Sequence, residues 1–258
     1  MKDQYDVLVL GSSRAHHHYV PKIIEDSLGV TFYNAGYDGN GIIMMTGIYR
    51  MIIQRYQPKL IVYDVETDFD LFENKDDNNR TRYLAGLKPY YSQPGIPDIF
   101  KDVSNEEYYK MFSGLCRYNS VSVSLLMDCL TKRPMDNQGY SPLSGKMIEE
   151  PIKKKRVETP TTDSLKLQYM HDFIMDVSER GIPLILVASP KYGAVGSLDF
   201  EPIKEICDDY QVPFVDFYTD SVFMANKEWF KDREHLNDTG ARIYTNKMVH
   251  VLRSNLVL

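Results

Sequence analysis

The feature that most constrains the fold is an alternation of short apolar runs with longer amphipathic segments at the start of the chain. Apolar runs at residues 6–10, 30–34 and 60–65 are separated by segments at 14–28 and 42–56 whose patterns are typical of helices. Strands that are joined by helices lie parallel, and their crossovers are right-handed. This part of the chain therefore predicts a β-α-β-α-β unit in a parallel sheet.

The same alternation returns near residue 162 and continues through the last part of the sequence. We expect helices at 162–180, 200–210 and 237–252, and strands at 182–188 and 212–217. Together these elements predict a three-layer α/β/α, flavodoxin-like domain with a central parallel sheet of about five strands. The strand order 2-1-3-4-5 would bring the loops after the first and fifth strands to one edge of the sheet.

The stretch between about residues 72 and 160 departs from this alternation. It is polar, aromatic and rich in turns, and its sequence has no set of strands of its own. We interpret it as an insertion after the third strand, within a single domain that spans residues 1–258. Helices are expected in it at 105–114 and 120–130, followed by a long irregular loop at 131–160.

Composition and charge limit the classes of function. With a net charge of -6, the chain is not expected to bind nucleic acid, which needs clustered Lys and Arg. Its three cysteines include no C-x-x-C pair, which argues against a disulfide framework or a zinc site. No apolar run reaches the ~20 residues of a membrane span. We expect no signal peptide, because the first strand begins almost at once, although an upstream anchor removed from the natural product would fit the sequence equally well.

Polar residues with catalytic potential stand near both ends of the sequence. The first strand ends in Gly11-Ser12-Ser13, a turn that puts a small hydroxyl at the carboxyl edge of the sheet, where open α/β sheets bind ligands. Asp232 stands three residues before His235, in a loop that leads into the last helix. Such an Asp can fix the tautomer of the imidazole, and the second ring nitrogen can then take a proton from a hydroxyl.

Three blocks of the sequence resemble the SGNH (GDSL-type) hydrolase family. They are Gly11-Ser12-Ser13, Asn34-Ala35-Gly36-Tyr37-Asp38-Gly39 and Asp232-Arg233-Glu234-His235-Leu236-Asn237. The resemblance covers both ends of the chain and leaves the insertion outside it. Ser12 stands where the family usually has Asp, and G-S-S variants resemble proteins of D-alanyl transfer and polysaccharide O-acetylation. An exported or periplasmic setting would be compatible with this resemblance, and the compartment and oligomeric state stay open.

The resemblance implies a role for each of these residues. Ser13 would be the nucleophile, His235 the general base and Asp232 the residue that orients the base. The oxyanion would be bound by the backbone N–H groups of Ser13 and Gly39, and one such donor is worth roughly 3–4 kcal/mol of barrier. The reaction would be hydrolysis of a small-molecule or glycan ester, with O-acylated and in particular O-acetylated carbohydrate as the expected substrate class. It would need no metal and no organic cofactor.

One block departs from the family pattern. Where the family has G-x-N-D after the third strand, Glu66 replaces the Gly and Asp68 replaces the Asn that donates to the oxyanion. An ionised Asp cannot donate a hydrogen bond, so Asp68 is protonated, is replaced by another donor, or has a different role such as binding Arg14 or a substrate hydroxyl. Arg14 could itself bind an anionic substrate group or form an ordinary ion pair. These departures keep two alternatives open beside the esterase: an O-acyltransferase with the same triad, and a carbohydrate-binding relative without catalysis.

Two further features near the nucleophile need an interpretation. Residues 16–18 are three adjacent histidines, and we expect no metal site there, because adjacent residues do not share a helix face and no carboxylate supplies an obvious ligand set. His17 lies four residues after Ser13 and could line the pocket. Asn34 is expected to hold its loop rather than to touch substrate.

Overall fold

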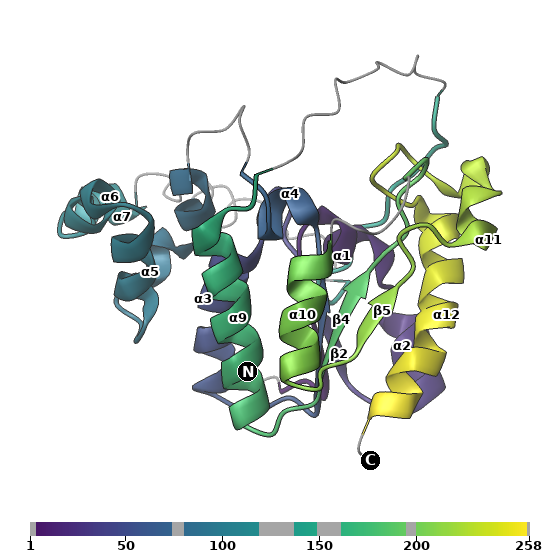
Figure 1. The fold of residues 1–258 in the computed structure, drawn as a ribbon, viewed down its shortest axis with the longest axis horizontal. Coiled ribbons are helices and arrows are strands. Elements are labelled where there is room, and N and C mark those ends of the chain that lie inside the picture. Colours follow the sequence, from purple (N-terminus) through teal and green to yellow (C-terminus); the bar gives the residue numbers. More distant parts are fainter. Residues whose placement is uncertain (1–3, 74–79, 119–136, 149–160, 195–199, 257–258) are drawn as a thin grey trace, which may run out of the picture.

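The computed structural model describes residues 4–73, 80–118, 137–148, 161–194 and 200–256. At its centre is a parallel sheet of five strands in the order β2-β1-β3-β4-β5. Helices cover both faces of this sheet and give the molecule three layers (Figure 1). The predicted fold class and the predicted strand order are therefore confirmed.

The strands are short and apolar, as expected for a sheet that is covered on both faces. Their bounds are β1 (Val7–Gly11), β2 (Phe32–Asn34), β3 (Leu60–Asp64), β4 (Leu184–Ala188) and β5 (Phe214–Asp216). Every residue of β1, β3 and β4 is buried. Alternate side chains enter opposite cores: Leu8 and Leu10 belong to one, Val7 and Val9 to the other.

Each core is closed by its own set of helices. The core beneath Leu8 is covered by α3 (Ile42–Ile53), α9 (Ser164–Glu179) and α10 (Glu201–Asp209). The opposite core is covered by α1 (Ser13–His18), α2 (Pro21–Leu28) and α12 (Asp238–Asn255). Among the residues that the structure describes, no helix has the length and hydropathy needed to cross a membrane.

The helix expected at residues 14–28 is in fact two helices. Tyr19 and Val20 separate α1 from α2, and both have extended backbone angles. Pro21 is the physical reason, because the ring of a proline disfavours the helical conformation of the residue before it. The break turns α1 into a short helix of six residues that stays at the edge of the sheet.

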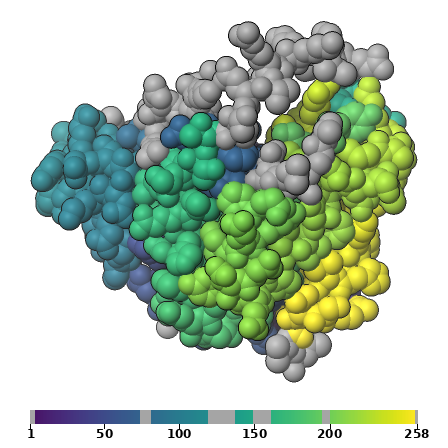
Figure 2. Space-filling model, in the orientation of Figure 1, coloured from purple at the N-terminus to yellow at the C-terminus, as the bar shows by residue number. Residues whose placement is uncertain are grey.

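A short helix, α4 (Thr67–Asp70), follows β3 directly and precedes the insertion. Residues 80–118 of the insertion are helical and pack beside α3. Their elements are the 3-10 helix η1 (Arg80–Tyr90), α5 (Ile96–Val103), α6 (Asn105–Lys110) and α7 (Gly114–Tyr118). Residues 80–118 form a lobe at one edge of the molecule (Figure 2). The helix expected at 120–130 lies outside the described residues.

The last described piece of the insertion, residues 137–148, crosses between the two ends of the chain. Backbone hydrogen bonds join this segment to His16 and Asn34 near the start of the sequence, and to Phe230 and Asp238 near its end. The sequence predicted only an irregular loop here. The segment is irregular, but its hydrogen bonds tie together the loops that lie at the carboxyl edge of the sheet. Short elements α11 (Ser221–Met224) and η3 (Lys227–Trp229) precede these loops.

Candidate active site

The candidate site lies where β1 and β3 end side by side. Gly11 is paired with Asp64 at this edge, and the chain leaves β1 towards β2 on one side while β3 lies on the other. Open α/β sheets bind ligands at such switch points. Gly11 has a φ of +140°, and a Cβ at this position would lie 2.5 Å from the carbonyl oxygen of Asp64. Only glycine fits here, and the turn it makes carries Ser13 over the edge of the sheet.

Ser13, His235 and Asp232 form one hydrogen-bonded chain. The Ser13 Oγ lies 2.8 Å from His235 Nε2, although the two residues are 222 positions apart. The other ring nitrogen, Nδ1, lies 2.9 and 3.0 Å from the two carboxylate oxygens of Asp232. Because a carboxylate accepts, Nδ1 carries the hydrogen, and the lone pair of Nε2 faces the serine hydroxyl. This arrangement can take a proton from Ser13.

The Asp232 carboxylate is itself held in place by backbone donors. It accepts the N–H groups of Glu234 at 2.8 Å and of His235 at 2.9 Å. Burial alone would raise the pKa of Asp232, but the hydrogen bond and charge of His235, together with these N–H groups, lower it below its usual value. The carboxylate therefore stays ionised at neutral pH, and it can stabilise an imidazolium at His235.

The loop that carries His235 is closed by its own backbone. Phe230 and Leu236 pair as an antiparallel bridge, and Lys231 donates its N–H to the carbonyl of His235 at 2.9 Å. The N–H of Leu236 points inward and donates to Nε2 of His18 at 2.9 Å. The residue after the candidate base is thus anchored to α1, the helix that begins with Ser13.

His18 connects this loop to the ends of two further strands. Its ring is fully buried, and since Nε2 accepts from Leu236, Nδ1 donates to the Ser189 hydroxyl at 3.1 Å. Ser189 donates in turn to Asp64 Oδ1 at 3.0 Å. Burial lowers the pKa of His18 well below its usual value, so the ring is neutral. This network was not predicted from the sequence. The available signal was that Asp64 ends β3 and Ser189 follows β4 directly.

Arg14 lies beneath Ser13 and has a fully buried side chain. Its Nε is 2.5 Å from a carboxylate oxygen of Glu66, and its Nη2 donates to the carbonyl of Val65 at 2.7 Å. The ion pair, one of the two interpretations of Arg14, is therefore present, and its full burial leaves no part of the guanidinium exposed to solvent. Binding of an anionic substrate group stays a prediction. Burial raises the pKa of Glu66, and the charge of Arg14 opposes that rise.

Asp68 stands in the sequence where the family has its oxyanion-donating Asn. It is exposed on α4, and its backbone carbonyl accepts from Lys166 Nζ at 2.8 Å. Arg14 is paired with Glu66 instead, so the expectation that Asp68 binds Arg14 is wrong. Within the described part of the chain, the Asp68 side chain has no hydrogen bond or ion pair with Ser13 or His235. Contact of Asp68 with a substrate hydroxyl stays a prediction.

The loop after β2 is held by Asn34 and contains the candidate oxyanion donor. Asn34 is buried, donates to the carbonyl of Ala15 at 2.7 Å and accepts the N–H of Gly36 at 2.9 Å. These bonds use the amide within the protein, in keeping with a loop-holding residue. Gly39 has a φ of +67°, a conformation that L side chains rarely adopt. Its role as an oxyanion donor stays a prediction.

The structure also brings His17 beside the candidate base. The rings of His17 and His235 meet edge to face, with centroids 5.6 Å apart. His17 Nδ1 is 2.6 Å from the carbonyl oxygen of Ser141, in the 137–148 segment. His17, which the sequence indicated could line the pocket, is thus a buried residue that lies next to the candidate base.

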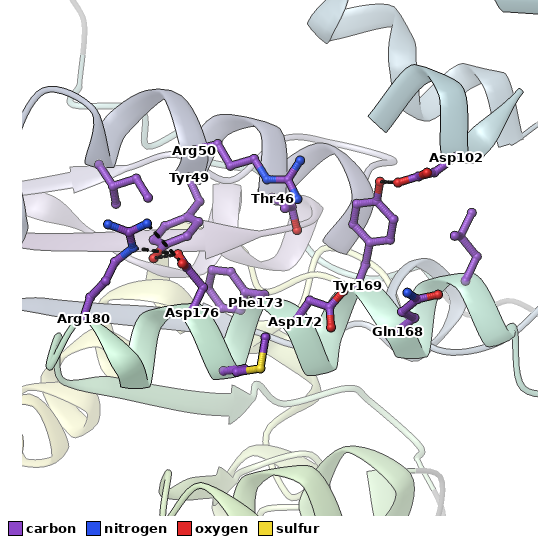
Figure 3. A pocket seen from close by; sticks show the side chains of 13 residues that line it. Thr46, Tyr49, Arg50, Asp102, Gln168, Tyr169, Asp172, Phe173, Asp176 and Arg180 are labelled. Carbon is purple, nitrogen blue, oxygen red and sulfur yellow. Dashed lines mark hydrogen bonds and ion pairs between the residues drawn. The ribbon is translucent and has the colours of Figure 1, made fainter. Parts of the chain in front are cut away.

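A cavity of about 520 Å³ lies elsewhere, between α3, α5 and α9. Figure 3 shows that its polar side chains are turned towards one another. Asp176 accepts from Tyr49 at 2.6 Å and from Arg180 at 2.8 Å, and Tyr169 donates to Asp102 at 2.8 Å. None of Ser13, Asp232 and His235 lines this cavity.

Known proteins were compared with this chain in sequence and in fold. No protein-family model matches the sequence, and no curated protein matches it either. One solved structure with a similar fold is an acetyl xylan esterase, at 13% identity and a TM-score of 0.47, covering 95% of this chain and 99% of the other. Another is a mutant of an acetyl-xylooligosaccharide esterase from Geobacillus, at 10% identity and a TM-score of 0.48, covering 100% and 97%.

Proposed function

We propose that this protein is a serine esterase of the SGNH type, which forms an acyl-enzyme on Ser13. The observation that carries the proposal is the 2.8 Å contact between Ser13 Oγ and His235 Nε2, with the opposite ring nitrogen held by Asp232. Ser13 and His235 are half-buried and 222 positions apart in the sequence, and a structural role alone does not require that they meet with the Nε2 lone pair facing the hydroxyl. The same order of groups defines the nucleophile, base and orienting residue of serine hydrolases.

The proposed reaction has two steps. In the first, His235 takes the hydroxyl proton of Ser13 while Oγ attacks the ester carbonyl, and the departing alcohol then receives that proton. In the second, His235 takes a proton from water, the hydroxide attacks the acyl-serine, and the acid leaves as Ser13 regains its hydrogen. Asp232 stays ionised in both steps and stabilises the imidazolium.

The oxyanion would be bound by the backbone N–H groups of Ser13 and Gly39. The positive φ of Gly39 is compatible with this role, because it lets the loop after β2 turn its backbone towards the edge of the sheet. The substrate class we propose is an O-acylated carbohydrate, in particular an O-acetylated one. This part of the proposal rests on the sequence resemblance to polysaccharide O-acetylation proteins.

Substitution of the triad tests the proposal. We expect Ser13→Ala and His235→Ala to lower kcat/KM for p-nitrophenyl acetate by at least about 10³-fold, and Asp232→Asn by about 10²–10⁴-fold, because the last change disturbs the tautomer. Asp26→Asn is the matched control: it makes the same carboxylate-to-amide change on an exposed residue of α2, whose carboxylate pairs with Lys22 and not with the triad. A Ser13→Ala variant with wild-type turnover would disprove the mechanism.

The acyl acceptor is tested with an O-acetylated oligosaccharide. Wild-type protein is expected to release free acetate with water as the acceptor, and mass spectrometry of a quenched reaction is expected to find the acetyl group on Ser13. Acetate that moves to an added glycan hydroxyl instead of to water would identify an acyltransferase with the same triad. If a serine-reactive phosphonate labels neither wild type nor Ser13→Ala, the protein is a binding relative without catalysis.

A further inference from the structure

His16, His17 and Asp38 converge at the rim of the candidate active site. His16 Nδ1 lies 2.7 Å from Asp38 Oδ1, and His17 Nε2 lies 3.2 Å from the same oxygen. One potential ligand atom from each of the three residues falls within 4.8 Å of the others. The two imidazoles are stacked, with ring centroids 4.7 Å apart. The expectation that adjacent histidines would diverge, and that no carboxylate would join them, is therefore wrong.

The orientation of the His17 ring is the informative observation. The carbonyl of Ser141, 2.6 Å from Nδ1, can only accept a hydrogen bond, so Nδ1 carries a hydrogen. In the neutral ring, Nε2 then turns a lone pair towards the Asp38 carboxylate. Two facing lone pairs repel unless a positive charge lies between them, which must be a second proton or a metal ion. Histidines that bind metals usually donate their other ring N–H to a carbonyl or carboxylate in this manner.

The chemistry of the three donors favours a particular class of cation. Imidazole nitrogens suit zinc and its first-row neighbours, whereas calcium and magnesium prefer sites made of oxygen. Donors bound to one such ion at about 2.0–2.2 Å lie about 3.0–3.5 Å apart. The 3.2 Å between Asp38 and His17 already has this value, whereas His16, at 2.7 Å from Asp38, would have to move slightly away from it. The side chain of Asp38 is 56% exposed and that of His16 27%, so both can adjust and leave room for water as a further ligand.

His18, the third member of the run, takes no part in this cluster. Both of its ring nitrogens are used, one by Leu236 and the other by Ser189. The described part of the chain has this one group of three potential ligands. A second His–Asp pair, His171 and Asp172 at 3.2 Å on α9, has no third member. It provides a matched control, because its side chains are 44% and 49% exposed.

We propose that His16, His17 and Asp38 form a binding site for a divalent first-row transition metal ion such as Zn²⁺, with the Ser141 carbonyl orienting His17. The site shares no residue with the proposed triad. It therefore does not require Ser13 to be a nucleophile. A bound ion would add positive charge beside the ring of His235, and it would fix Asp38, the residue before Gly39.

Metal binding is measured directly, on full-length protein without a polyhistidine tag and after dialysis against EDTA. Isothermal titration with Zn²⁺ is expected to give one ion per chain, and Co²⁺ is expected to produce visible absorption bands. Asp38→Asn and His17→Ala should each weaken binding by at least about tenfold, while His171→Gln should leave it unchanged. Binding should weaken as the pH falls, because protons compete for the imidazoles.

The same measurements can overturn the proposal. It fails if wild-type protein gives neither binding heat nor Co²⁺ bands, or if Asp38→Asn, which removes an exposed charge and keeps the shape of the side chain, binds the metal as well as wild type. In the first case, nitrogen-detected NMR should find His17 doubly protonated near neutral pH, and the cluster is then a hydrogen-bonded ion pair. Repeating the titration with Ser13→Ala separates this result from the esterase proposal, since that variant is expected to bind the ion normally.

Discussion

His17 and His18 are neighbours in the sequence, yet they belong to two sides of the site that differ in their physics. On the buried side, His18 is fully enclosed, and burial lowers its pKa well below 6.5. On the rim, burial would also lower the pKa of His17, but its hydrogen bonds to Asp38 and to the Ser141 carbonyl outweigh this and raise the pKa. One residue is kept neutral and the other is drawn towards positive charge.

The two sides of the site therefore have different roles: the buried side fixes its geometry, and the rim can respond to the solvent. The buried side joins α1 to the ends of β3 and β4 through hydrogen bonds that no solvent can replace, and so it fixes geometry. The rim faces water through Asp38, so its state can follow pH and dissolved ions. The rigid hydrogen-bond network of His18 and the solvent-exposed cluster around Asp38 thus lie on either side of the Ser13 hydroxyl.

The largest difference between the two sides is expected when a carboxylate is neutralised on each. Glu66→Gln leaves the buried Arg14 without its counter-ion and should lower the free energy of unfolding by about 3–5 kcal/mol. Asp38→Asn on the rim should cost less than about 1 kcal/mol, because its pairs with His16 and His17 are partly solvated. Urea denaturation followed by circular dichroism measures the free energy of unfolding of both variants. Equal losses of stability in the two variants would contradict the contrast between the buried side and the rim.

Truncation of the two histidines should give a smaller contrast. His18→Ala leaves the Leu236 N–H without an acceptor inside the protein, and should cost about 2–3 kcal/mol of stability. His17→Ala should cost about 1 kcal/mol. The kcat of ester hydrolysis should also fall in His18→Ala, because the loop that carries His235 loses its anchor, and His18→Gln, which keeps an acceptor, should recover part of the loss. A His18→Ala protein with stability and kcat like those of His17→Ala would contradict this account.

The smallest expected effect concerns the pH dependence of stability, to which His18 and His17 contribute with opposite signs. Because its pKa is lowered on folding, His18 contributes stability that is complete above pH 6.5 and is lost as the pH falls below it. His17, whose pKa is raised, contributes stability that is complete below pH 6.5 and is lost as the pH rises through the raised value. Each slope is limited to one proton, about 1.4 kcal/mol per pH unit. Unfolding curves from pH 5 to 8 should lose the first slope in His18→Gln and the second in His17→Gln; slopes that persist in both would assign them to other groups.

The fold could be predicted because its signals are local. Apolar runs such as Val7–Leu10 and Leu60–Val65 define buried strands, and the helices between them leave a parallel sheet as the available arrangement. The juxtaposition of Ser13 with His235 followed from the same reasoning, since both stand in loops at the carboxyl edge. Pro21 even carried the signal for the helix break, which the expectation of one continuous helix overlooked.

The buried network of His18, Ser189 and Asp64 could not be predicted, because its hydrogen bonds join residues that are distant in the sequence and share no sequence pattern. The link from His18 to Ser189 spans 171 positions, and the link from Ser189 to Asp64 spans 125. In a sequence of three adjacent histidines, nothing shows which of them will be buried and which will lie at the rim. From the sequence, Arg14 could pair with Asp64, Glu66 or Asp68, and the folded structure pairs it with Glu66.

The distance in sequence between Ser13 and His235 has a consequence for biosynthesis. The strands of the sheet end at Asp216, so a ribosome has made the whole sheet, and the serine at its edge, before it reaches His235. Until then the nascent protein has a hydroxyl with no base beside it. If the proposed esterase is correct, catalysis cannot begin on a partial translation product that stops before His235, and such a product is an inert chain rather than an unregulated enzyme.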